Sequence, residues 1–419
     1  MNYYFIGING ISMSALAVLL AQQGNHVCGS DLITKNEILK AYGIEIFYES
    51  NFKEIAKADV VVFSSAIKGD NCDMIYAKKL NKKILSRGEM LGKIANSYEK
   101  VIAVAGSHGK TTTTALIYNV LKEAGERPTL HLGGVLCEEK TNVVVGDKKY
   151  FVTEACEYHD NFLYLYPYIS VVTNIEKEHM DYFKTFSNEL NSFKTFMKQS
   201  KFVVQQNSHY YPSNIRYKNG KLCFLIYHEK KKCLFLNMNI CEEVNVFNCI
   251  YAYRVCKLLN LPDCIIKKGL ESFKGVKRRF EKVNCKYFNT VIVDYAHHPT
   301  EIKNTIKTCE KVFKGKKIVY IFQPHTYSRT LTLLKDFKKL FEKVDNLILF
   351  KTYEARENVK DGISAKRLSE LIENKNLKYC SNLKILMKTL FTTLKKEDVL
   401  VFIGAGDLPA SLYENKFIY

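Results

Sequence analysis

Residues 101–121, VIAVAGSHGKTTTTALIYNVL, constrain the fold more than any other stretch of the chain. An apolar run leads into small residues, then Lys110, four threonines and apolar residues at helical spacing that end at Gly125. A strand, a tight loop and a helix in this order wrap backbone N–H groups around phosphate oxygens at a helix N-terminus. The stretch therefore predicts an α/β domain that binds a nucleotide.

Each residue type in this loop has a physical use. Glycines let the backbone approach a phosphate, a lysine reaches the β- and γ-phosphates, and a threonine hydroxyl can hold magnesium. Val104 stands where the strict phosphate-loop pattern has a glycine, so the loop is a shortened variant. The predicted ATP-binding residues of the loop are Gly106, Ser107, His108, Gly109, Lys110, Thr111 and Thr112.

Strand-like and helical segments alternate along the remaining chain, which predicts parallel sheets with helical crossovers. We expect three domains: a Rossmann-like domain at 1–99, a central phosphate-loop ATPase domain at 100–281, and a second Rossmann-like domain at 282–419. Residues 142–157 are predicted to form two strands around a Gly-Asp turn, and residues 201–238 an antiparallel region. Polar loops follow most predicted strands, where such sheets bind ligands.

Composition narrows the function classes. The 419 residues carry a net charge of +19, which suits anionic partners but also an ordinary lysine-rich surface. The 13 scattered cysteines include no CxxC pair, which favours a reducing cytoplasm over a disulfide framework or a zinc ribbon. We expect no leader, no membrane span and no nucleic-acid partner, because no segment or motif supports one.

Further polar residues follow other predicted strands. Glu154 and His179 are candidate ligands of a magnesium ion next to the loop, although each alone could be an ordinary surface residue. The N-terminal GINGISMSALA approaches a dinucleotide fingerprint but lacks its later glycine, since Ser12 stands there. Asp31 lies where a ribose-binding acid is expected.

Motifs along the whole chain resemble those of the Mur ligases of peptidoglycan synthesis. They are GINGISMSALA, GSD, VVFSSAI, SRGEML, GSHGKTTTT, HLGG, TEACE, VVTNIEKEHMDYF, NVFN, RRFE, DYAHHPTEI, FQPHTYSRT and GAGDL. GSHGKTTTT, HHPTE and FQPH are most similar to the member that adds the first amino acid of the stem peptide. The resemblance implies that ATP and Mg²⁺ activate the carboxylate of UDP-N-acetylmuramate as an acyl phosphate, which L-alanine then attacks.

The resemblance also implies residue roles. Lys110 stabilises the transferred phosphoryl group, and Thr111, Glu154 and His179 hold the metal. Asn245, Asn248, Arg279 and Asp294 contact ATP. The expected UDP-sugar-binding residues are Gly7, Asn9, Gly10, Ser12, Met13, Ser14, Asp31, Ser64, Ser65 and Ala66. His325 and Arg329 are expected to bind the amino acid, with His297 nearby and His298 as the general base.

Four positions depart from the family pattern. Val244 replaces a histidine, Cys156 and His159 replace aspartates, and Thr326 replaces an arginine. The departures leave the alanine contacts open. Carbamylation of Lys194 or Lys198 and the choice between a monomer and a homodimer also stay open.

Three other functions compete with the leading hypothesis. A recycling ligase would use the same chemistry to attach a preformed tripeptide. A dinucleotide-dependent oxidoreductase would use only the first domain, and a nucleic-acid-binding ATPase would use the positive charge.

Overall fold

The computed structural model describes residues 1–218, 220–355, 357 and 359–419. Internal packing divides the chain into two units. The first unit comprises residues 1–214, 224–238 and 245–274, and the second comprises 215–223, 239–244 and 275–419. The predicted domains 1–99 and 100–281 fall largely into the first unit, because one apolar core runs from Leu16 and Leu91 to Phe151 and Phe162.

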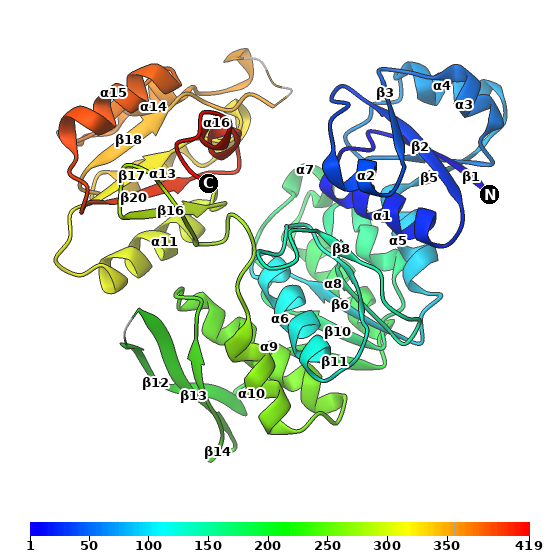
Figure 1. The fold of residues 1–419 in the computed structure, drawn as a ribbon, viewed down its shortest axis with the longest axis horizontal. Helices are drawn as coiled ribbons and strands as arrows, with labels where there is room; N and C mark the ends of the chain where they lie inside the picture. The colour runs from blue at the N-terminus through cyan, green and yellow to red at the C-terminus, as the bar shows by residue number, and fades with distance from the viewer. Residues whose placement is uncertain (219, 356, 358) are drawn as a thin grey trace. The chain divides into compact units, whose positions relative to one another are not determined.

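The N-terminal sheet is parallel, as predicted, with the order β3-β2-β1-β4-β5 (Figure 1). Its strands are β1 (Asn2–Ile6), β2 (His26–Asp31), β3 (Glu45–Tyr48), β4 (Val60–Phe63) and β5 (Lys83–Ser86). The helices are α1 (Ile11–Gln22), α2 (Glu37–Ala41), α3 (Phe52–Lys57), α4 (Cys72–Lys79) and α5 (Arg87–Ala95). Strands β1 and β4 are buried apolar runs, as parallel strands covered on both faces are, and the middle of β2 is also buried.

The central sheet has the order β11-β10-β6-β9-β7-β8, with β6 between two parallel neighbours. Its strands are β6 (Lys100–Ala105), β7 (Thr129–His131), β8 (Val143–Val144), β9 (Tyr150–Glu154), β10 (Ile169–Val172) and β11 (Phe202–Gln205). The helical segments around it are α6 (Lys110–Glu123), the 3₁₀ segment η1 (Tyr158–Tyr164), α7 (Met180–Phe183), α8 (Phe186–Lys198), α9 (Val244–Leu258) and α10 (Asp263–Ser272).

The two strands predicted around the Gly-Asp turn exist, but they do not pair with each other. Strand β7 lies between them, antiparallel to β8 and parallel to β9. The turn packs on the first residue of β7 and on the segment before it, where Gly146 donates to the Thr129 hydroxyl and Asp147 donates to the Arg127 carbonyl. This contact carries the chain past β7, so a long-range interaction decides the strand order.

A three-stranded sheet follows, made of β12 (Tyr210–Lys218), β13 (Lys221–His228) and β14 (Lys231–Met238). Strands β13 and β14 are joined by only two residues, which requires the predicted antiparallel pairing.

The sheet of the second unit has the order β15-β16-β20-β17-β18-β19, and only β15 runs antiparallel to its neighbour. Its strands are β15 (Glu281–Val283), β16 (Thr290–Asp294), β17 (Ile318–Phe322), β18 (Leu347–Phe350), β19 (Lys378–Cys380) and β20 (Val399–Ile403). The helical segments are α11 (Pro299–Val312), α12 (Tyr327–Thr332), α13 (Leu334–Phe341), η2 (Val359–Asp361), α14 (Ala365–Leu371), α15 (Leu383–Thr393) and α16 (Leu408–Glu414). Among the described residues, no helix is both long and apolar enough to span a bilayer.

Helix α6, which follows the phosphate loop, packs closely against α10. Asn119 of α6 donates to the Gly269 carbonyl and, at 3.1 Å, to the Ser272 hydroxyl. A Cβ atom at Gly269 would lie 2.6 Å from the Val120 Cα. This close approach is why α10 carries a glycine in the middle of the helix.

We therefore expect Gly269→Ala to lower the free energy of unfolding by about 1–3 kcal/mol through overpacking. Chemical denaturation would measure the loss. Gly69→Ala is the control, because a Cβ there meets nothing within 4 Å. Equal stability of the two variants would contradict the tight α6–α10 contact.

Candidate active site

The loop after β6 adopts a backbone conformation that only glycine reaches easily. Gly106 has φ 126° and Gly109, the N-cap of α6, has φ 84°. The residues after β10 hold the loop in place. The Asn174 side chain accepts from the His108 N–H at 2.9 Å, and the Thr173 hydroxyl donates to the His108 carbonyl at 2.6 Å. The loop is therefore a rigid turn at the carboxyl ends of β6 and β10.

Lys110 folds back over this loop. Its ammonium donates to the Gly106 carbonyl and to Glu157 Oε1, the latter at 3.0 Å. Burial alone would lower the pKa of Lys110, but nearby Glu157, Cys156 and Glu178 outweigh burial and raise it. The lysine is therefore charged, and its partner is an acid that the motif analysis did not single out.

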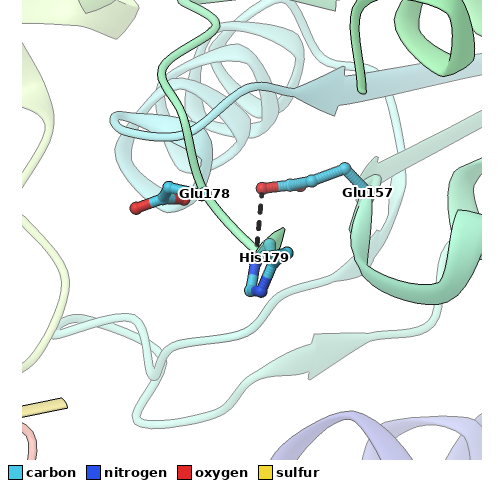
Figure 2. Close-up of side chains that lie close together, drawn as sticks. All are labelled: Glu157, Glu178 and His179. Atoms are coloured by element: carbon cyan, nitrogen blue, oxygen red, sulfur yellow. Dashed lines mark ion pairs between the residues drawn. The ribbon is translucent and has the colours of Figure 1, made fainter. Parts of the chain in front are cut away.

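Glu157, Glu178 and His179 form a group whose ligand atoms lie within 4.8 Å of one another (Figure 2). Glu157 is 1% exposed, and its Oε2 has no hydrogen-bond partner among the described residues. His179 Nε2 lies 3.9 Å from Glu157 Oε1. Two carboxylates and an imidazole suit Mg²⁺ or Mn²⁺, and a buried oxygen without a partner is what a cation would satisfy.

The predicted metal ligands are divided between two places. His179 belongs to the group above, whereas Glu154 accepts from the Thr111 hydroxyl at 3.0 Å and from the Gly133 N–H. Sequence reasoning missed Glu157 and Glu178. Glu157 lies three residues after Glu154 in the same motif, and Glu178 immediately precedes His179. The closeness of these two acids to Glu154 and His179 in the motifs was the signal that could have found them. Only the fold shows which acid faces Lys110.

Other predicted ATP contacts of the first unit lie on α9. A Cβ at Gly109 would come 2.5 Å from Asn248 Oδ1, so this amide lies against the loop. Asn248 donates to Asn245 Oδ1 at 2.9 Å, and both residues are buried. The structure thus brings Asn245 and Asn248 to the phosphate loop.

The predicted sugar-nucleotide residues gather after β1, β2 and β4. Gly7 donates to the Ser30 carbonyl, Asn9 donates its backbone N–H to Asp31 at 2.9 Å, and a Cβ at Gly7 would touch Ser64. Ala66 donates its N–H to the Ser64 hydroxyl, and Gly10 is the N-cap of α1.

Two of the predicted sugar-nucleotide-binding residues, Met13 and Ser14, have buried side chains. Met13 is 1% exposed within the apolar core, and Ser14 is buried with its hydroxyl donated to the Ile11 carbonyl. Both side chains lie on the inward face of α1, so they are part of the core.

A cavity of about 310 Å³ is lined by Phe63, Ser65, Ser86, Arg87, Glu89, His159, Asn161 and Tyr164. Ser65 was predicted as a sugar-nucleotide contact, whereas Arg87 was not singled out. Arg87 donates to the Ser12 hydroxyl at 3.3 Å, and Ser12 also contacts His131 Nε2 at 2.9 Å. An arginine, a histidine and hydroxyl groups suit an anionic, hydroxyl-rich ligand.

In the second unit, Asp294 at the end of β16 is buried and accepts from the Thr305 hydroxyl at 2.5 Å. Burial raises the pKa of Asp294, although Thr305 and Arg279 favour its charged form. The guanidinium groups of Arg279 and Arg278 both lie about 5 Å from the Tyr295 ring centroid. The predicted pair Arg279 and Asp294 therefore lies together.

Three predicted residues of the second unit, His297, His325 and Arg329, lie in a row with His325 in the middle. The rings of His297 and His325 are 6.4 Å apart, and Arg329 Nη1 lies 3.2 Å from His325 Nδ1. Burial lowers the pKa of His297 to about 4 and also lowers that of His325, so both rings are neutral at pH 7. His298 caps α11, with its Nδ1 accepting the Thr300 N–H. A neutral ring in this contact has its proton on Nε2, which counts against the predicted role as general base.

Three family models match consecutive parts of the chain. The Mur ligase family catalytic domain covers residues 2–99, the Mur ligase middle domain covers 104–243, and the Mur ligase glutamate ligase domain covers 278–406. Together with the phosphate loop, they define a multidomain α/β ligase.

Relatives and solved structures support the same family assignment. The UDP-N-acetylmuramate–L-alanine ligases of Alkaliphilus metalliredigens and Clostridium acetobutylicum are 36% and 38% identical, over 97% of this chain and 95% of each relative. The crystal structure of the UDP-N-acetylmuramate-alanine ligase MurC from Thermotoga maritima is 26% identical, with a TM-score of 0.85 over 99% of this chain and 98% of that one. A murein peptide ligase from Psychrobacter arcticus shares the fold, with a TM-score of 0.71 at 21% identity over 99% of this chain and 98% of that one. The chain belongs to the Mur ligase family.

We expect His131 to make stability depend on pH. Burial, with Arg87 nearby, lowers the pKa of His131 to about 3, so the folded protein keeps the ring neutral. The unfolded chain takes up a proton below about pH 6.5, so stability falls as the pH drops through this range. By pH 5 this histidine alone should remove about 2 kcal/mol.

Urea unfolding of wild type and His131→Gln at pH 7.5 and pH 5 would measure this effect. The variant is expected to be less stable at pH 7.5 but to lose less on acidification. An identical loss in both proteins would show that His131 is not held neutral.

Proposed function

We propose that this chain, an ATP-dependent ligase of the Mur family, joins L-alanine to the lactoyl carboxylate of UDP-N-acetylmuramate. The observation that carries the proposal is Lys110, charged and half-buried, held between the phosphate loop and the Glu157–Glu178–His179 group. The names of the relatives supply the substrates, and the site supplies the phosphoryl chemistry.

The reaction must overcome the inertness of a carboxylate. Transfer of the γ-phosphoryl group of ATP to a carboxylate oxygen releases ADP and gives an acyl phosphate. The alanine nitrogen then attacks the carbonyl carbon and forms the amide bond. The bond from that carbon to the phosphate oxygen breaks, inorganic phosphate leaves, and a base takes the proton from the amine. Each step develops charge on phosphate or carbonyl oxygens, which positioned cations and N–H groups stabilise.

This chain has groups that would stabilise the negative charge that develops on these oxygens. Backbone N–H groups at the start of α6 and the Lys110 ammonium would face the β- and γ-phosphates once Lys110 leaves Glu157. Glu157, Glu178 and His179 would hold Mg²⁺, with Thr111 and Glu154 as a second candidate pair. Bound Mg²⁺ would neutralise negative charge between the phosphate and the substrate carboxylate.

The second unit offers groups for the amino acid. Arg329, oriented by His325, would bind the alanine carboxylate. We further propose that the protein works in the cytoplasm on soluble precursors. We propose that it acts as a monomer or as a homodimer.

The direct test is phosphate release from ATP in the presence of UDP-N-acetylmuramate, with and without L-alanine. We expect alanine-dependent turnover that Lys110→Ala lowers by roughly 10²-fold or more, because a cation aimed at developing charge contributes on that scale. Lys122→Ala is the matched control, since Lys122 lies on the same helix and pairs with surface Glu139. Full activity of a folded Lys110→Ala variant would refute the assignment.

The same assay separates the two ligase hypotheses. We expect L-alanine to support turnover and a preformed tripeptide to support little. A preference for the tripeptide would establish the recycling reaction instead.

His298 can be tested by a substitution that preserves its structural role. Asparagine is a good N-cap, so His298→Asn should keep α11 and change kcat by only a few fold. A loss of about 10²–10⁴-fold would instead identify His298 as the general base.

A further inference from the structure

A third carboxylate lies behind the Glu157–Glu178–His179 group. Glu189 of α8 is 0% exposed, and neither of its carboxylate oxygens makes a hydrogen bond of ordinary geometry. The backbone N–H of Glu178 interacts favourably with the Glu189 carboxylate, whereas the charges of Glu157 and Glu178 repel that carboxylate. A buried carboxylate without a full partner destabilises a fold, so its presence needs a reason.

Helix α8 is fixed to the segments that carry the group. Thr185 caps the helix, and Asn188 donates to the Phe183 carbonyl at 2.8 Å, which ties α8 to the end of α7, just after His179. One turn beyond Glu189, Ser192 donates to Asp160, which follows Glu157 by three residues and also accepts from Tyr182. These contacts fix α8, in which Glu189 is fully buried.

Local structure does not account for the residue. A carboxylate in the first turn of a helix is favoured by the helix N-terminus, but an exposed one gains the same benefit. The neighbouring inward residues of α8, Phe193 and Phe196, pack in the apolar core, where a leucine would also fit. What distinguishes position 189 is its place beside two other acids.

We propose that Glu189 is a positioning residue for a divalent cation bound by Glu157, Glu178 and His179. Its carboxylate orients the Glu178 backbone and adds negative charge behind the ligands, so that a cation relieves the repulsion among two buried acids and the half-buried Glu178. Glu189 thus lowers the stability of the metal-free protein and raises its affinity for metal. The inference rests on the proposed function only in taking this cation as the Mg²⁺ of the ligase reaction.

The test measures metal binding and stability on the full chain at pH 8. Free Mn²⁺ in a titration, followed by electron paramagnetic resonance, gives the affinity, and thermal unfolding in chelator and in Mn²⁺ gives the stabilities. We expect Glu189→Gln to bind Mn²⁺ about tenfold or more weakly, the scale of groups that orient metal ligands. We also expect its Tm in chelator to rise above that of wild type.

Two further variants test whether the charge of Glu189 causes the change in Mn²⁺ affinity. Glu189→Asp keeps the charge and should restore part of the Mn²⁺ affinity. Asp73→Asn is the matched control, because Asp73 is another fully buried carboxylate but accepts from Ser30 and Tyr4 in the N-terminal sheet. It should leave Mn²⁺ affinity unchanged.

Wild-type Mn²⁺ affinity in Glu189→Gln, or a lower Tm in chelator, would overturn the proposal, as would wild-type protein that binds no Mn²⁺. Weakened Mn²⁺ binding in a protein without alanine-dependent phosphate release would support Glu189 and refute the proposed function.

Discussion

The site depends on the attachment of the phosphate loop to the exit of β10. Thr173 binds the carbonyl of His108 and Asn174 binds its N–H, and these two hydrogen bonds hold the turn between β6 and α6. The same strand exit leads directly into the segment that carries Glu178 and His179. One set of backbone contacts therefore fixes the loop and aims the acidic group at Lys110.

The alternation of strands and helices, the loop and its flanking elements could be predicted from the sequence, because each follows from local periodicity and from glycines in left-handed conformations. The order of β7, β8 and β9 could not, because the Gly146 turn packs on residues near Arg127. Glu157 and Glu189 were missed for a related reason. A buried acid and a surface acid look the same in a sequence, and only tertiary contacts exclude solvent from one of them.

Side-chain direction was a further limit. Met13 and Ser14 stand in a motif that favours ligand contact, yet the helical turn points both into the core. His298 stands among other histidines, but its place immediately before Pro299 makes it a helix cap. The motifs thus identify loops that the fold places at the carboxyl ends of strands, whereas the direction of each side chain depends on which face of its element it occupies.

With Lys110 and Glu157 in the roles proposed for them, their contact would make ATP and the cation thermodynamically linked ligands. The Lys110 ammonium donates to Glu157 and to the carbonyls of its own loop, and ATP would compete with these acceptors for it. A cation bound by Glu157 would free the lysine to contact the phosphates. Because such coupling is reciprocal, the ligand that binds first would make the second bind more tightly. Protein with only one of the two ligands bound would therefore be disfavoured.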